Sequence, residues 1–153
     1  MSEPQTRSVQ QLMDLSGRTA LVTGGSRGLG LQMAQALGEA GARLVISSRK
    51  ANELEEAAEQ LRAAGIDVTP LAVDLADEDA VIGLADRALE VLGRVDILVN
   101  NAGASWGAPA EDYPMEGWDK VMTLNVRNLF LLTREIGRRS MIPNGGGRVV
   151  NVA

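Results

Sequence analysis

The chain has 153 residues, 45% of them hydrophobic and 23% charged, and its formal net charge is −5 at pH 7. That length is enough for one domain with a hydrophobic core, and the negative charge argues against nucleic acid as a partner. The sequence contains no cysteine and no histidine. Disulfides, zinc ligation by these residues and a Ser-His-Asp triad within this chain are therefore excluded, and no metal is expected.

The first residues are typical of a leader outside the domain. Residues 1–11 are polar and lack the apolar core of a secretory signal, and no apolar run is long enough to span a bilayer. We expect a flexible leader over residues 1–14, a segment Leu12–Gly17 that packs on the domain edge, and one domain over residues 15–153. The expected location is the cytoplasm.

Beyond the leader, short apolar runs alternate with segments whose apolar residues recur at helical spacing. The runs predict strands at Thr19–Thr23, Arg43–Ser47, Asp67–Val73, Val95–Val99 and Arg148–Val152. The helical spacing predicts helices at Leu29–Ala40, Asn52–Ala64, Asp77–Leu92 and Glu116 to about Ser140. This alternation predicts βαβ units and hence a doubly wound, Rossmann-type parallel sheet with helices on both faces.

The last predicted strand, Arg148–Val152, is followed by a single residue. A domain does not normally stop on a buried-type strand with an open edge. We therefore expect the chain to be the front part of something longer, with the sheet incomplete on its C-terminal side. Whether it is truncated or a natural fragment stays open at this point.

A glycine-rich segment, TGGSRGLG, lies between the first predicted strand and the first predicted helix. Gly24 suits a tight turn, Gly28 lets a pyrophosphate approach the backbone, and Gly30 lets the helix pack closely on the strand. The alternative is a plain turn, since glycines also mark ordinary turns. The strand before and the helix after favour dinucleotide binding, with these loop residues at the cofactor: Gly24, Ser26, Arg27, Gly28, Leu29 and Gly30.

The end of the second strand, Ser47-Ser48-Arg49, indicates which dinucleotide is bound. NAD-binding proteins carry a carboxylate here for the ribose 2′-hydroxyl, and this chain has none. Arg49 can pair with a 2′-phosphate, and Ser47 or Ser48 can donate hydrogen bonds to it. The sequence therefore favours NADP(H) over NAD(H). The alternative is that Arg49 and Lys50 form a solvated helix start.

Together these motifs resemble the short-chain dehydrogenase/reductase family over nearly the whole chain, from about Leu15 to Ala153. The resemblance rests on motifs in the family's order, namely TGGSRGLG, Asp74-Leu75, Asn100-Asn101-Ala102-Gly103, Asn125 in TLNV, and the strand Arg148–Val152. Any one of them is weak evidence, whereas all of them in this order are specific. The resemblance implies an NADP(H)-dependent oxidoreductase that transfers hydride between the nicotinamide and a carbonyl or alcohol substrate.

The resemblance also implies roles for individual residues. Asp74 and Leu75 would contact the adenine, and Asn101, Ala102 and Gly103 would lie against the cofactor. Asp74 can instead be a plain helix N-cap, and the Asn-Asn-Ala-Gly turn can simply end a strand.

Asn125 matches the family's catalytic asparagine, which helps to hold a water in the proton relay. Because asparagine is a poor helix former, its mid-helix position also indicates a local kink. The alternative is an asparagine on a solvated helix face.

The sequence departs from the family's pattern at its catalytic end. The family's serine and its Tyr-x-x-x-Lys pair would fall beyond Ala153. Tyr113 is the only tyrosine, and the residue four positions on is Gly117 rather than lysine, so we do not assign Tyr113 as the acid. We expect the chain alone to bind cofactor without turning over substrate. The alternatives are a non-catalytic NADP(H)-binding module and a fragment that is unfolded on its own.

The loop from Ala104 to Pro114 is expected to border the substrate. Trp106 can line a pocket there or pack under the loop. This region is similar to 3-oxoacyl-carrier-protein reductase-like and gluconate-5-dehydrogenase-like members of the family. The resemblance further implies a homodimer or homotetramer, with the long helix around Asn125 contributing to the interface.

Overall fold

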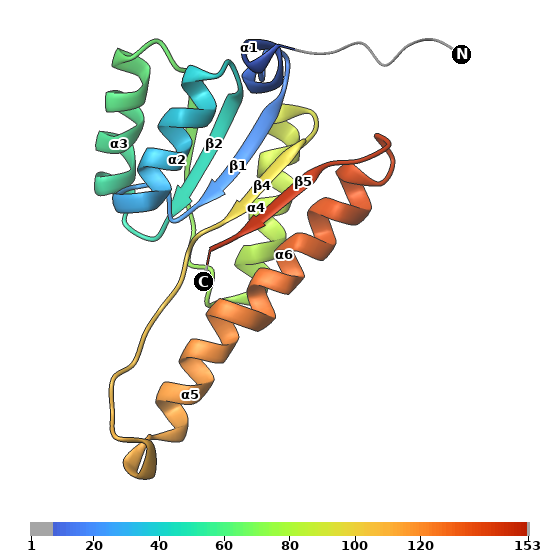
Figure 1. Ribbon diagram of the computed structural model, residues 1–153. Helices are drawn as coiled ribbons and strands as arrows, with labels where there is room; N and C mark the ends of the chain where they lie inside the picture. Colours follow the sequence, from blue (N-terminus) through green and yellow to red (C-terminus); the bar gives the residue numbers. More distant parts are fainter. Residues whose placement is uncertain (1–7, 153) are drawn as a thin grey trace.

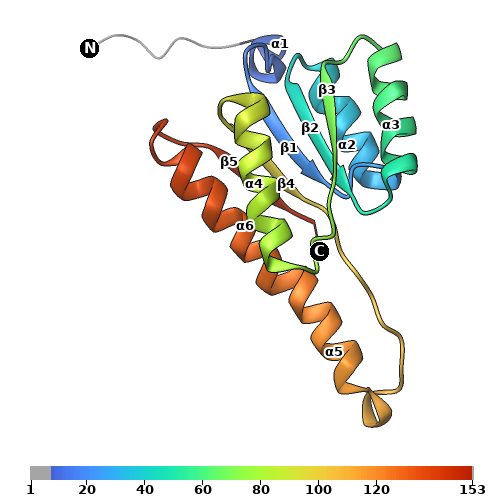
Figure 2. The ribbon, with the colours of Figure 1, turned by 180° about the vertical axis from the view of Figure 1, so that it is seen from behind.

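A computed structural model describes residues 8–152 and shows an open parallel sheet with helices on both faces (Figures 1 and 2). The strand order is β3-β2-β1-β4-β5, and each neighbouring pair is parallel. This confirms the predicted fold class. The strands are β1 (Thr19–Thr23), β2 (Arg43–Ser48), β3 (Val68–Ala72), β4 (Ile97–Asn100) and β5 (Arg148–Asn151).

The helices lie on the two faces as a doubly wound sheet requires. One face carries α2 (Gly28–Glu39) and α3 (Ala51–Ala63), and the other carries α4 (Glu78–Leu92) and α6 (Leu129–Ile136) (Figures 1 and 2). Every residue of the central strand β1 is buried because both of its faces are covered. The β4–α5 connection contains a short 3₁₀ helix, Ala110–Asp112, and α5 (Met115–Met122) extends past the end of the sheet (Figure 1).

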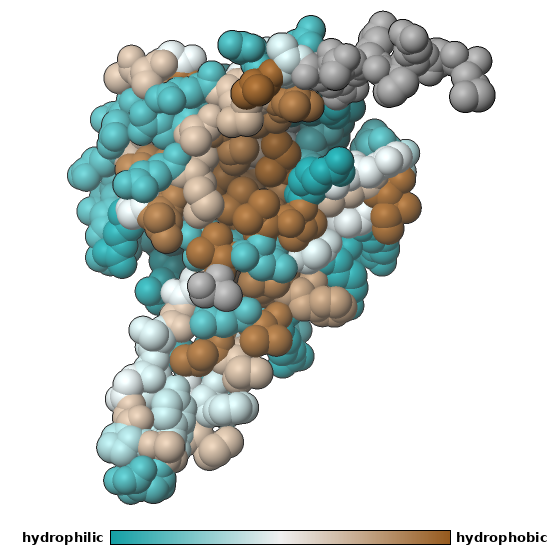
Figure 3. Space-filling model, viewed as in Figure 1, coloured by the Kyte–Doolittle hydropathy of each residue, from teal (hydrophilic) through white to brown (hydrophobic). Residues whose placement is uncertain are grey.

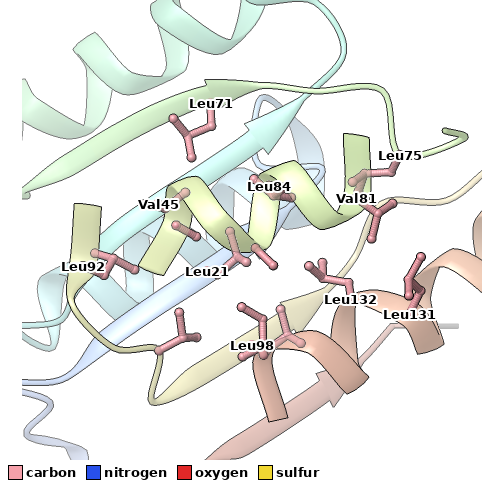
Figure 4. Close-up of a cluster of buried hydrophobic side chains, with 14 of the residues drawn as sticks. Leu21, Val45, Leu71, Leu75, Val81, Leu84, Leu92, Leu98, Leu131 and Leu132 are labelled. Carbon is pink, nitrogen blue, oxygen red and sulfur yellow. The ribbon is translucent and has the colours of Figure 1, made fainter. Parts of the chain in front are cut away.

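The core consists of one apolar cluster on each face of the sheet. Figure 4 shows the cluster beneath α4 and α6, where Leu21 and Leu98 of the sheet meet Leu84 and Leu132 of the helices. Each of these leucines is at most 1% exposed, and burying such a side chain stabilises the fold by about 1.5–3 kcal/mol. The second cluster, around Ile46 and Leu54, joins α2 and α3 to the sheet.

The helices α2 and α3 cover only part of their face of the sheet. The edge strand β5 is exposed along its length, and Val150 and Val152 are 46% and 37% exposed. Figure 3 shows hydrophobic surface over β1, β4 and β5 between these helices and α6. The sheet is therefore open at β5, as the sequence predicted.

The long helix expected from Glu116 to about Ser140 is continuous but not uniformly α-helical. Two π-helical segments, Thr123–Asn128 and Gly137–Met141, interrupt it after α5 and after α6. The first, which we call the π segment, contains Asn125, where the sequence predicted a local irregularity. Its asparagines and the β-branched Thr123 and Val126 are poor helix formers, so widening the helix costs little there.

The N-terminal leader predicted over residues 1–14 falls partly outside the described residues, which begin at Ser8. Ser8 caps a short helix, α1 (Val9–Met13), in a capping box with Gln11, and none of the residues of α1 is buried. Leu12 is 62% exposed, so the packing expected from Leu12 onward is wrong there and begins instead at Leu15, which contacts the α2–α3 core cluster. Within the described part of the chain, no helix is long and apolar enough to cross a membrane.

Candidate nucleotide-binding site

The carboxyl ends of β1, β2 and β4 point to the same end of the sheet (Figure 1). A cleft of about 340 Å³ lies there. Its walls are the loops that follow the first four strands, with residues 24–30 after β1, Ser48–Glu53 after β2, Val73–Leu75 after β3 and Asn101–Gly103 after β4. This is the place where open parallel sheets bind their ligands. The structure thus brings almost all the predicted cofactor residues into one cleft.

The glycine loop has the geometry that the sequence predicted. Gly24 and Gly28 adopt φ values of +66° and +54°, which favour glycine. A Cβ on Gly30 would overlap the carbonyl oxygen of Gly24, so only glycine lets α2 start this close to the loop. The N-cap residue of α2, Arg27, makes no side-chain capping hydrogen bond within the described residues. The free N–H groups and the helix dipole of α2 therefore provide an anion site at the cleft.

Side-chain hydrogen bonds hold the glycine loop to the end of β4. The Thr23 hydroxyl accepts from the backbone N–H groups of Asn101 and Ala102, both at 3.0 Å. The Asn101 amide in turn donates to the carbonyl oxygens of Thr23 and Gly24, both at 3.1 Å. Asn101 therefore shapes the floor of the cleft in addition to lining it, and the turn does more than end a strand.

The two serines predicted at the end of β2 face opposite ways, as successive strand residues do. Ser48 lines the cleft together with Arg49. Ser47 is fully buried and does not line it, so a direct contact between Ser47 and the cofactor is wrong. Within residues 8–152 the Ser48 hydroxyl has no hydrogen-bond partner although it is buried, which leaves it free to bond a ligand in the cleft.

Charged side chains at this end of the cleft carry a net positive charge. Lys50 donates to Glu53 at 2.5 Å, and this hydrogen bond is the main reason why the pKa of Glu53 lies below its ordinary value, with Arg27 adding to the effect. Glu53 is thus ionised and paired with Lys50, whereas Arg27 and Arg49 also line the cleft. Lys50 and Glu53 were not among the predicted cofactor residues, although Glu53 lies in the first turn of the predicted helix Asn52–Ala64 and Lys50 lies just before it.

The Asp74-Leu75 segment after β3 also reaches the cleft. Asp74 and Leu75 both line it. The Asp74 carboxylate accepts from the N–H of Ala76 at 3.0 Å, whereas Asp77 is the N-cap of α4 and accepts from Asp79 and Ala80. The N-cap alternative proposed for Asp74 therefore belongs to Asp77, and Asp74 forms a local turn at the cleft wall.

Asn125 binds the loop that follows β4 rather than facing solvent. Its side-chain oxygen accepts from Ala104 N–H and its amide donates to the Ala104 carbonyl, both at 2.8 Å. A Cβ on Gly103 would lie 3.4 Å from the same Asn125 oxygen. The alternative of an asparagine on a solvated face is thus wrong. Asn125 thereby fixes the loop that leaves the cleft after Gly103.

Trp106 packs under its own loop, which settles the choice left open by the sequence. Its ring lies so close to Gly117 of α5 that a Cβ on Gly117 would overlap it. Lys120 also approaches the ring, with its ammonium 5.3 Å from the centroid. The Tyr113 hydroxyl donates to the Trp106 carbonyl at 3.3 Å, so the tyrosine braces the loop.

The parallel sheet, the glycine loop and the cleft at the carboxyl ends define a Rossmann-type nucleotide-binding fold. The chain belongs to the short chain dehydrogenase family, whose family model matches residues 18–153. This confirms the family that the motifs predicted.

Similar proteins come from this family. Over 141 residues the chain is 47% identical to a rhamnolipids biosynthesis 3-oxoacyl-acyl-carrier-protein reductase of Pseudomonas aeruginosa, covering 90% of this chain and 55% of the relative. It is 40% identical to gluconate 5-dehydrogenase of Gluconobacter oxydans, covering 92% and 55%. A solved Pseudomonas aeruginosa RhlG/NADP active-site complex has a TM-score of 0.81 and 46% identity, covering 90% and 54%. The chain spans about half the length of the curated relatives it matches.

Proposed function

We propose that this chain binds NADP(H) in the cleft and is the nucleotide-binding part of an oxidoreductase. The observation that carries the proposal is the pairing of the glycine loop with Ser48 and Arg49 at one end of the same cleft. Free helix N–H groups suit the pyrophosphate, and a guanidinium suits a 2′-phosphate. The similar RhlG structure, which contains NADP in its active site, supports this choice.

The described residues fit the cofactor by their geometry. Gly28 has open space where a Cβ would stand, so the backbone at the helix start is accessible to a phosphate. Ser48, whose buried hydroxyl has no partner within residues 8–152, lines the cleft together with the exposed Arg49 and with Arg27. When bound, the nicotinamide supplies hydride chemistry. The chain's own residues orient the dinucleotide along the cleft and hold its phosphates.

For the reaction, we propose hydride exchange with a carbonyl or alcohol carbon of a small molecule. Asn125 fixes the Ala104 backbone beside the cleft and so sets the border of the substrate side. Its role as a catalytic residue in a water relay is part of this proposal. The named activities of the relatives, a 3-oxoacyl thioester reductase and a gluconate 5-dehydrogenase, indicate the substrate classes to try first. The alternative is a non-catalytic NADP(H)-binding module.

We also propose that the chain self-associates through its long helix, as a homodimer or homotetramer. An exposed apolar stripe runs along α5, the π segment and α6, with Trp118, Met122, Val126 and Phe130 between 37% and 64% exposed. Each member follows the previous one by four residues, so the side chains share one helix face. A contiguous apolar stripe of this kind marks an interaction surface.

The charge reversal Arg49→Asp tests the cofactor. We expect the wild-type chain to bind NADPH more tightly than NADH in equilibrium titrations that follow cofactor fluorescence. Losing the guanidinium removes a charge-assisted contact of about 1.5–3 kcal/mol, so NADPH affinity should fall roughly ten- to a hundredfold while NADH binding is kept or improves. The control is Arg87→Asp, a reversal on the exposed side of α4. Equal affinities of wild type and R49D for each cofactor would overturn the NADP(H) assignment.

A further inference from the structure

We propose that Asn128 is a positioning residue for the adenine side of the cofactor site. This inference rests on the proposed function. Asn128 lies in the π segment and is only 2% exposed. Its side-chain amide donates to the carbonyl oxygen of Leu75 at 2.7 Å, across 53 residues of sequence. Leu75 lines the cleft next to Asp74, so Asn128 acts on the site without touching the ligand.

Within residues 8–152, packing of the Leu75 side chain in the core and hydrogen bonds on either side of Leu75 also hold this wall, including one from the Asp77 N–H to the Asp74 carbonyl at 3.3 Å. The Val73 N–H donates to the Ser48 carbonyl at 2.9 Å, and the Ala76 N–H donates to the Asp74 carboxylate at 3.0 Å. The Leu75 peptide lies between these points. With its carbonyl held by Asn128, this peptide keeps one orientation, and the Leu75 side chain stays against the cleft. Releasing the carbonyl frees the peptide to rotate.

The two polar atoms of the Asn128 side chain are used unequally. Its nitrogen donates to Leu75, whereas its oxygen is buried and has no hydrogen-bond partner within residues 8–152. Beside it lies a cavity of about 10 Å³ bordered by Thr23, Asn100 and Leu124, which is the size of a single water. A buried oxygen left without a protein partner is a cost. Among the described residues, the contact that the Asn128 side chain makes is thus through its donor half.

The π segment places Asn128 and Asn125 against two of the loops at the cleft, those that follow β3 and β4. Asn125 holds the Ala104 backbone after β4, and Asn128 holds the Leu75 backbone after β3. One widened helical turn therefore braces both loops at once. Such π-helical turns recur at functional sites. The Asn128 contact should then affect ligands that carry the adenine half of the cofactor.

The test compares Asn128→Leu with Ser140→Ala by calorimetric titration with 2′,5′-ADP. N128L keeps the branched shape of the side chain and removes the donor. S140A removes an equally buried side-chain hydrogen bond from the same long helix, but one that reaches Val95 at the other end of the sheet. We expect N128L to weaken 2′,5′-ADP about tenfold and S140A to leave it unchanged, with both variants showing a lowered melting temperature. Unchanged affinity in N128L, or the same loss in both variants, would overturn the proposal.

A second variant, Asn128→Asp, separates positioning from general destabilisation. At about pH 8 the introduced carboxyl is ionised and cannot donate to Leu75, whereas burial raises its pKa so that near pH 5.5 it is partly protonated and can donate. We expect N128D to bind 2′,5′-ADP more weakly than wild type at the higher pH, with the gap narrowing as the pH falls. No gap at the higher pH would overturn the proposal. Failure of the wild type itself to bind 2′,5′-ADP would instead count against the proposed function.

Discussion

At the scale of single residues, Gly30 has the strictest requirement in the site. A Cβ there would overlap the Gly24 carbonyl, whereas a Cβ on Gly83, a helical glycine of α4, meets nothing within 4 Å. We expect Gly30→Ala to displace the start of α2, destabilise the fold by about 1–3 kcal/mol and lower NADPH affinity at least tenfold. Gly83→Ala should stabilise the chain by up to about 1 kcal/mol and leave binding unchanged.

Chemical denaturation and NADPH titration of the two glycine variants measure both effects. If G30A binds NADPH as tightly as G83A, then the glycine loop does not hold the pyrophosphate. Such a result would leave the fold intact and remove the main support for the site.

Residue types and spacing predicted most of the site because each motif follows a strand whose end the sheet geometry fixes. The exceptions have physical causes. Ser47 was expected in the cleft, but strand alternation turns it into the core and leaves Ser48 at the surface of the cleft. The contact between Asn128 and Leu75 joins residues 53 positions apart, and no local pattern reports such a distant backbone partner.

At the scale of elements, the four predicted helices and the five predicted strands match the structure to within two residues, whereas the short helix α1 was not predicted. The strand β4 begins at Ile97 rather than Val95. Val95 bonds the Ser140 hydroxyl through both its N–H and its carbonyl, so its backbone is engaged by a helix side chain. Helix propensity likewise could not predict the length of the π segment around Asn125. Its asparagines are held by contacts with two loops that are distant in sequence.

The π segment also determines which side chains share the exposed face of the long helix. A four-residue spacing drifts around an α-helix, since a turn holds 3.6 residues. A wider π turn between Met122 and Phe130 offsets that drift and keeps the apolar stripe on one face. The same turn points its asparagines to the cleft loops. The interface that we propose and the site walls are therefore built on one element.

The apolar stripe leads to a prediction about assembly. Phe130 is 64% exposed, and Phe130→Asp places a charge within the proposed contact. We expect the wild-type chain to self-associate and F130D to shift towards monomer, because burying an unpaired carboxylate in an interface is unfavourable. Sedimentation equilibrium measures the change. The control is Ile142→Asp, since Ile142 is 75% exposed and lies outside the stripe. Equal dissociation of F130D and I142D would contradict this interface.

At the scale of the whole molecule, the cofactor and the fold depend on each other. The cleft walls come from loops after β1, β2, β3 and β4, so a ligand that joins them stabilises the sheet order itself. The open edge at β5 lowers the stability of the sheet instead, because it leaves apolar side chains exposed. Whether the isolated chain is folded and whether it binds NADP(H) can therefore be answered together.

The most direct measurement is thermal unfolding of the wild-type chain with and without NADPH, followed by circular dichroism. We expect the chain to unfold in one cooperative transition. With NADPH at about a hundred times its Kd, stability should rise by about 2.7 kcal/mol, which moves the melting temperature upward by roughly 5–10 °C. NADH at the same concentration should produce a smaller shift. A broad, non-cooperative transition, or a melting temperature that NADPH does not change, would contradict the proposal that the folded chain binds NADP(H).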